Sequence, residues 1–192
     1  MAGPNFAVEM ATKCCTATVV CSQEKVIAQE LKDILTNDYF KAYTSDDVIG
    51  VQVGGAIKNV ICLAAGFVHG SCFSQNSIAF LLTLGLEEMA KLSVCLGGKK
   101  DTVYGLAGFG DLVLSATGSL SRNLKAGKLI GQGKKMQDLE TEFGTLPEGI
   151  NTVYSIYNLI KKCNLDLPIC TGTYEVIFED KSVEDFLKQI FI

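Results

Sequence analysis

The sequence contains no tryptophan, three prolines and one histidine among its 192 residues. Its eight cysteines include no C-x-x-C pair, and a zinc site needs clustered ligands, so no metal site is expected. Several cysteines lie inside apolar runs, where a reduced thiol packs as a small hydrophobic group. This pattern favours a reducing, cytoplasmic location over a disulfide-linked scaffold.

Positive charge is also scarce. Seventeen lysines and arginines stand against 21 acidic residues, which gives a net charge of −4 and a pI near 5.1. No basic run carries interleaved aromatic residues, so nucleic acid is not expected as a partner. Residues 1–6 do not show the basic region followed by an apolar one that is typical of a signal peptide.

One long apolar run, residues 48–67, carries a single charge, that of Lys58. Three roles compete for this stretch. Its length suits a transmembrane helix, but Gln52, Lys58 and Asn59 are central and no dense basic cluster flanks it, so membrane insertion is not expected. A core helix with a lysine that reaches solvent is the second role. The third is a lysine held in a cleft for chemistry.

The first 45 residues differ in pattern from the remainder. Residues 16–21 form a short β-branched run typical of a strand, a helical period follows from Ser22, and residues 39–43 resume as a strand. A single strand–helix–strand unit cannot bury both faces of a sheet. We therefore interpret residues 1–45 as the tail of a larger α/β domain.

Residues 46–192 predict an all-α domain, so the fold class is mostly α. Asp46 and Asp47 precede the apolar run as a plausible helix start, because acidic groups favour the N-terminal end of the helix dipole. Gly97 and Gly98 end a second helix. Apolar spacing predicts helices over residues 48–70, 76–96, 122–130, 136–143, 148–163 and 169–178, and from Ser182 onwards.

Polar residues interrupt the apolar and glycine-rich settings of this domain at four places, namely Lys58–Asn59, Asp111, Ser121–Asn123 and Glu148. A buried lysine beside a carboxylate can exchange a proton with a substrate, and Lys58 with Asp111 would make such a pair. A purely structural ion pair explains Asp111 nearly as well.

The triplet Ser121-Arg122-Asn123 stands where a glycine-containing turn enters a helix. An arginine fork, a hydroxyl and free helix N–H groups together suit a phosphate group. Ordinary helix capping by the serine is the alternative.

Five motifs, in order and at natural spacing, resemble the bacterial-type NAD(P)-dependent glycerol-3-phosphate dehydrogenase family. They are Gly3-Pro-Asn-Phe-Ala7, Gly50-Val-Gln-Val-Gly-Gly-Ala-Ile-Lys-Asn-Val60, Gly105-Leu-Ala-Gly-Phe-Gly-Asp-Leu-Val-Leu114, Ser121-Arg-Asn123 and Pro147-Glu-Gly149. The resemblance implies a helical substrate domain of the 6-phosphogluconate-dehydrogenase-like type, preceded by a β-α-β remnant of a Rossmann domain. It further implies a cytoplasmic homodimer that uses NAD or NADP to interconvert dihydroxyacetone phosphate and sn-glycerol 3-phosphate, a precursor of phospholipids.

The same resemblance implies roles for single residues. Lys58 matches the family's catalytic lysine, and Asp111 matches its acidic partner. Substrate contacts are implied for Gly3, Asn5, Lys58, Asn59, Asp111, Ser121, Arg122 and Asn123. Cofactor contacts are implied for Ala7, Arg122, Leu146 and Glu148. At position 5 the family usually has serine or threonine, so Asn5 is the least secure of these matches.

No G-x-G-x-x-G fingerprint follows a strand anywhere in the sequence. We therefore expect a truncated chain that folds through its helical domain and has little or no dehydrogenase activity alone. Two other functions stay open, namely the helical domain of a related hydroxy-acid dehydrogenase and a non-catalytic association module.

Overall fold

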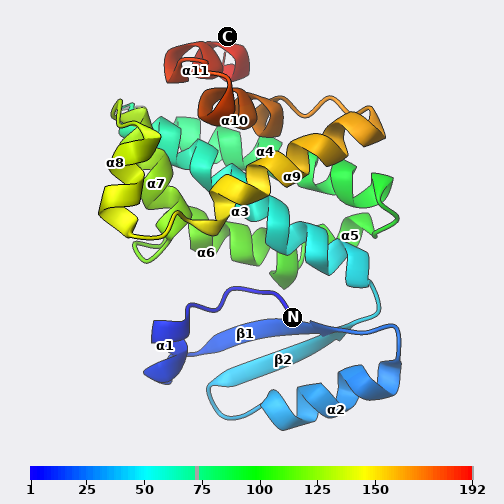
Figure 1. Cartoon of the computed structure of the whole chain (residues 1–192). Helices are drawn as coiled ribbons and strands as arrows, with labels where there is room; N and C mark the ends of the chain where they lie inside the picture. Colours follow the sequence, from blue (N-terminus) through cyan, green and yellow to red (C-terminus); the bar gives the residue numbers. More distant parts are fainter. Residues whose placement is uncertain (72–73, 192) are drawn as a thin grey trace.

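The computed structural model describes residues 1–71 and 74–191, so Cys72 falls outside the described residues. Figure 1 shows a small α/β part below a larger group of helices, with the N-terminus between them. For description, residues 1–45 form the α/β part and residues 46–191 the helical part. The expected mostly helical fold with a short parallel sheet is confirmed, whereas the domain boundary at residue 45 stays a prediction.

The α/β part contains a parallel pair of strands, β1 (Thr16–Cys21) and β2 (Phe40–Ser45), joined through α2 (Lys25–Leu35). Thr16 pairs with Phe40 and Cys21 with Ser45, while Ala2 forms an antiparallel bridge with Val19 on β1. The first strand lies where the sequence predicts it. The second begins one residue later than predicted and runs two residues further, and a short helix, α1 (Ala7–Ala11), was not predicted.

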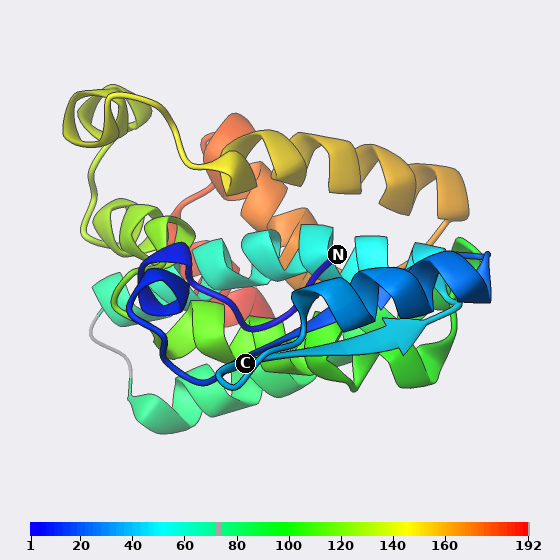
Figure 2. The same cartoon turned by 90° about the horizontal axis from the view of Figure 1, so that it is seen from below.

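Helix α2 leaves its apolar stripe uncovered in this chain. Ala28 is its one buried residue, whereas the side chains of Val26 and Ile34 are 70% and 77% exposed. Figure 2, which views the molecule from below, shows α2 in front of the strands, on the face turned away from the helical part. The opposite face of β1 is covered, because Val19 packs with Val51 and Ala107 of the helical part.

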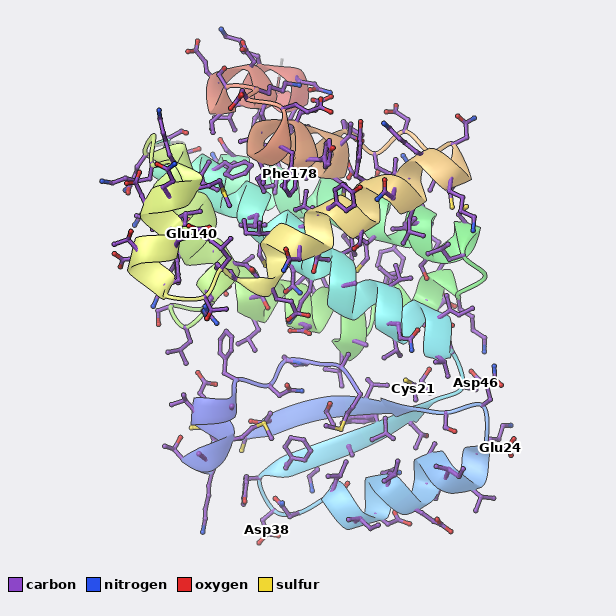
Figure 3. All side chains as sticks on the ribbon, in the orientation of Figure 1. Cys21, Glu24, Asp38, Asp46, Glu140 and Phe178 are labelled. Carbon is purple, nitrogen blue, oxygen red and sulfur yellow. The ribbon has the colours of Figure 1, made fainter. Side chains whose placement is uncertain are left out.

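The apolar run forms α3 (Val48–Gly70), the central helix of the helical part. It begins at Asp47, whose carboxylate accepts the Gly50 N–H at 2.9 Å and the Lys99 N–H at 2.8 Å. Asp46, labelled beside this junction in Figure 3, forms an exposed ion pair with Lys99. Helix α3 is long and apolar enough to cross a bilayer, but 67% of its apolar window is buried inside the fold.

The remaining helices surround α3 and bury a single apolar core. Their bounds agree with the predicted ones to within a residue or two: α4 (Gln75–Cys95), α7 (Arg122–Gly131), α8 (Met136–Phe143), α9 (Glu148–Cys163), α10 (Pro168–Phe178) and α11 (Val183–Phe191). Glycines allow α7 to lie directly against α3. A Cβ on Gly127 would stand 2.1 Å from the Leu63 carbonyl oxygen and 2.9 Å from the Gly66 Cα.

Helices α4 and α10 are joined by a buried carboxylate. Glu88, 3% exposed, accepts the backbone N–H groups of Ile169 at 2.6 Å and Cys170 at 2.9 Å, in the first turn of α10. Burial raises the pKa of this carboxyl, and the two N–H donors partly offset that rise. Because Pro168 starts α10 without a side-chain cap, Glu88 supplies acceptors for orphan donors of that helix.

The glycine-rich stretch around residue 108 does not form one regular helix. It divides into α5 (Lys100–Val103), a π-helical turn (Leu106–Gly110) and α6 (Asp111–Thr117). A Cβ on Gly108 would lie 2.0 Å from the Val103 carbonyl oxygen, so this close turn requires glycine. π-Helical turns recur at functional sites, and this one ends at Asp111.

Candidate active site

A pocket of about 260 Å³ opens between the N-terminal segment, α3, α6 and the start of α9. Its lining brings together residues more than 140 positions apart in the sequence: Met1, Ala2, Gly3, Asn5, Gly55, Lys58, Asn59, Asp111 and Glu148. Six of the eleven different residues for which the sequence predicts a catalytic, substrate or cofactor role line it. Larger clefts exist elsewhere on the molecule, but this one holds the predicted proton-transfer pair.

The pair itself is an ion pair across two helices. The Lys58 Nζ on α3 lies 2.6 Å from the Asp111 Oδ1 on α6, and their side chains are 20% and 7% exposed. The π-helical turn aims the carboxylate at α3, while the glycine at position 54 lets the two segments approach. A Cβ on Gly54 would stand 2.6 Å from the Ala107 carbonyl oxygen. The π-helical turn before Asp111 and the close approach at Gly54 on α3 together fix the position of this ion pair.

Opposing influences act on the Asp111 carboxyl. Burial raises its pKa, whereas Lys58, Ser115 and the Gly3 backbone N–H lower it, and the net result is a raised pKa. Beneath the pair, burial raises the pKa of the Cys62 thiol to about 12, so this group stays neutral at physiological pH. The site is thus a partly dry environment in which the amine and the carboxylate stabilise each other.

The N-terminal segment closes one side of the pocket. The Asn5 Nδ2 donates to the buried Thr18 Oγ1 at 3.2 Å, and that hydroxyl donates to the Ala2 carbonyl at 3.3 Å. Gly3 has a φ of +154°, and a Cβ there would lie 2.9 Å from the Thr18 Cα. Strand β1 therefore holds Gly3 and Asn5 over Lys58, which is where the predicted substrate contacts would be needed.

The triplet at the start of α7 lies beside the pocket rather than in its lining. Ser121 caps the helix, because its Oγ accepts the Leu124 N–H at 3.2 Å. The Asn123 side chain joins three elements: its Nδ2 donates to the Asn59 Oδ1 at 3.0 Å, and its Oδ1 accepts the Gly149 N–H at 3.0 Å. Asn123 is thereby tied to the pocket residue Asn59.

Arg122 is not among the residues that line the Lys58 pocket. Its guanidinium donates to the Thr145 carbonyl and lies over the Phe143 ring, 5.7 Å from the ring centroid. It lines a separate open cleft with Lys125 and Lys128. In this arrangement Ser121 performs the capping role that the sequence left open, and Arg122 stands at the edge of the site.

The structure brings only some of the residues with predicted cofactor contacts to the pocket. Glu148 lines the pocket at the start of α9, Leu146 is half-buried against the core, and Ala7 is exposed at the start of α1. Of these three positions, Glu148 is the one that shares a pocket with Lys58. The turn between β1 and α2, residues 22–24, contains no glycine, so it offers no pyrophosphate cradle of the Rossmann kind.

Three residues of the site were not predicted from the sequence, namely Thr18, Cys62 and Ser115. Cys62 follows Lys58 by four positions and Ser115 follows Asp111 by four, so each lies one helical turn from a predicted catalytic residue. That spacing is the signal that could have identified both. Thr18 offers no such signal, because only the pairing of Ala2 with Val19 brings it near the pocket.

Comparison with known proteins assigns the chain to a family. The family model described as NAD-dependent glycerol-3-phosphate dehydrogenase C-terminus matches residues 47–188. A glycerol-3-phosphate dehydrogenase [NAD(P)+] from Citrifermentans bemidjiense is 41% identical over 190 residues, which are 99% of this chain and 57% of that protein. A protein of the same name from Staphylococcus aureus is 40% identical, with the same coverage of both chains.

Solved structures agree with this assignment. The crystal structure of glycerol-3-phosphate dehydrogenase from Coxiella burnetii superposes with a TM-score of 0.95 at 32% identity, over 98% of this chain and 58% of that one. The yeast enzyme superposes with a TM-score of 0.88 at 25% identity. The chain thus spans a little more than half the length of the relatives it matches. It belongs to the NAD-dependent glycerol-3-phosphate dehydrogenase family, and it corresponds to the C-terminal part of these proteins.

Proposed function

We propose that this chain provides the substrate-binding and proton-transfer part of an NAD(P)-dependent glycerol-3-phosphate dehydrogenase. The observation that carries the proposal is the Lys58–Asp111 ion pair at 2.6 Å, in a pocket lined by Gly3, Asn5 and Asn59. The substrate is a three-carbon phosphate, dihydroxyacetone phosphate or sn-glycerol 3-phosphate, and the reaction feeds glycerophospholipid synthesis. This choice is supported by relatives that match 99% of this chain and are named glycerol-3-phosphate dehydrogenase [NAD(P)+].

In the proposed mechanism Lys58 is the proton donor for reduction. A reduced nicotinamide, when bound, would supply the hydride that C2 of the ketone receives. As the π bond of the carbonyl is lost, the Lys58 ammonium gives a proton to the developing alkoxide oxygen, and in the reverse direction the neutral amine takes it back. The Asp111 carboxylate holds the amine in place and balances its charge. The proposed proton transfer requires the C2 oxygen to bind within hydrogen-bonding reach of the Lys58 Nζ.

The remainder of the pocket binds and orients the substrate. Asn59 and Asn5 offer amide groups to the hydroxyl oxygens of the substrate. Gly3 has no side chain, so the substrate can approach the protein backbone closely there. Arg122, Ser121 and Asn123 form the phosphate-binding edge, in which a rotation of the exposed Arg122 side chain would bring its guanidinium toward the substrate. Contacts of Ala7, Arg122, Leu146 and Glu148 with NAD or NADP belong to the same proposal.

The first prediction compares the chain alone with a chimera. In the chimera, the nucleotide-binding part of the Citrifermentans bemidjiense relative precedes this chain. We expect the chimera to oxidise NAD(P)H when dihydroxyacetone phosphate is added, and the 192-residue chain alone to show no measurable turnover. Absorbance of the reduced cofactor measures both. Unphosphorylated dihydroxyacetone is the control substrate, and a folded chimera that reduces it equally well would contradict the proposed phosphate substrate.

We also propose that the chain acts as a homodimer in the cytoplasm. The seven described cysteines are unpaired, which fits a reducing compartment. An aromatic cluster on α9 and α10 supports self-association, because Tyr154 and Phe178 are 54% and 44% exposed beside the stacked rings of Tyr157 and Tyr174. Phe178 is labelled on α10 in Figure 3.

The second prediction tests self-association. Sedimentation equilibrium at micromolar concentration should give the mass of a dimer, and Tyr154→Asp with Phe178→Asp should give a monomer, because buried unpaired charges oppose association. Glu140→Ala, on the exposed face of α8, is the control (Figure 3). A wild-type chain that sediments as a monomer would contradict the dimer, and a dimer that survives both substitutions would place its interface elsewhere.

A further inference from the structure

Ser115 lies beneath the ion pair, one turn along α6 from Asp111, and it is 5% exposed. Its Oγ accepts from the Lys58 Nζ at 3.3 Å and donates to the Asp111 Oδ1 at 3.4 Å. The hydroxyl therefore closes a triangle with the amine and the carboxylate. Both of its contacts are buried or partly buried, so water does not readily replace them.

The triangle restricts the lysine because its ammonium has a fixed number of N–H donors. A lysine ammonium has three N–H bonds. One is directed to the Asp111 Oδ1 and one to the Ser115 Oγ, which leaves the third for the pocket. With the carboxylate as its single partner, the ammonium could rotate about the N–H···O contact and carry its free protons away from the substrate. The second contact fixes the direction of the third.

Cys62 lies one turn along α3 from Lys58, and its thiol is 0% exposed. Ser115 is among the neighbours that act on the pKa of this thiol, so the two side chains lie close together. Burial raises the pKa of the thiol to about 12, so it is a neutral group and adds no charge beside the amine. Two pairs of residues thus face each other between the helices. Lys58 and Cys62 form the pair on α3, and Asp111 and Ser115 form the pair on α6.

We propose that Ser115 is a positioning residue whose hydroxyl fixes the Lys58 amine and the Asp111 carboxylate in one arrangement, with one amine proton aimed at the substrate carbonyl oxygen. The catalytic consequence rests on the proposed function. The arrangement of the three groups is independent of the proposed function. This arrangement can therefore be tested in the purified 192-residue chain without substrate or cofactor.

The test is an NMR titration of the Asp111 side-chain carboxyl in 13C-labelled protein. The groups around this carboxyl are Lys58, Cys62, Ser115 and the Gly3 N–H, and the same pocket is lined by Glu148 and by Met1, which carries the N-terminal ammonium. Substituting Ser115→Val removes a hydrogen bond to the charged form, so the pKa of Asp111 should rise further, by about one pH unit. Substituting Ser115→Thr has nearly the same shape but keeps the hydroxyl, and it should restore the wild-type midpoint.

Two controls separate positioning from general damage. The Asp46 carboxyl, whose pKa Lys99 lowers, lies just before α3 and outside the pocket lining, so it should titrate identically in all variants. Amide spectra show whether each variant is folded, and Ser115→Ala, which favours the helix, replaces the valine variant if that one unfolds. A folded variant without the hydroxyl whose Asp111 midpoint equals that of wild type would overturn the proposal. So would a threonine variant that titrates like the valine variant.

Discussion

Substituting Lys58→Ala in the chimera should lower the turnover number about a thousand-fold, because general acid catalysis contributes roughly 10²- to 10⁴-fold. Among the described residues that line the pocket, Lys58 is the one with a cationic side chain, so its loss removes the proposed proton donor for the developing alkoxide. The fold should persist, since 20% of the side chain is exposed and α3 is buried mainly by its apolar faces. Steady-state rates and circular dichroism measure the two effects.

Chemical rescue sharpens this prediction. A small primary amine such as methylamine fits the space that the lysine side chain leaves, so it should restore part of the lost rate in Lys58→Ala. The matched control is Lys99→Ala, which removes a lysine that also pairs with an aspartate but lies 62% exposed away from the pocket. It should retain the wild-type rate. If Lys58→Ala turns over as fast as Lys99→Ala, the proposed proton transfer is wrong.

The sequence predicted the helices well because their signals are local. Lys58 and Asp111 could be proposed as a pair from their chemistry and from the resemblance to a family, but no local spacing relates them, since 53 residues separate them. The contact depends on the π-helical turn at Leu106–Gly110, for which the apolar pattern gives no specific signal. Residue chemistry and the family resemblance therefore identified candidate site residues, whereas only the folded chain shows which of them meet.

The triplet Ser121–Asn123, for which we propose a phosphate-binding role, shows what local sequence could predict and what it could not. Capping by Ser121 was one of two roles that its position allowed, and the structure confirms that role through the Leu124 N–H. The direction of Arg122 could not be predicted, because it follows from Thr145 and Phe143, which the α8–α9 connection brings over α7. Contacts made by loops between helices leave no periodic signal in a sequence.

The contact between α3 and α7 carries the largest expected effect on stability. Substituting Gly127→Ala should destabilise the chain by about 3 kcal/mol or more, because the new Cβ would lie 2.1 Å from the Leu63 carbonyl oxygen and the helices would have to separate. Such a shift would separate Gly66 from Gly127 and weaken the packing between α3 and α7. Urea unfolding followed by circular dichroism measures the free energy.

A glycine on the same central helix provides the control. A Cβ on Gly55 would meet only the Ala2 Cβ, at an ordinary 3.6 Å, so Gly55→Ala should gain the helix propensity of alanine, up to about 1 kcal/mol. The two substitutions make the same chemical change and should move stability in opposite directions. If both raised the unfolding free energy, the glycines of α7 would be incidental to the packing. If Gly127→Ala alone lowers it, close backbone contact is what holds α7, and with it Asn123, beside the pocket.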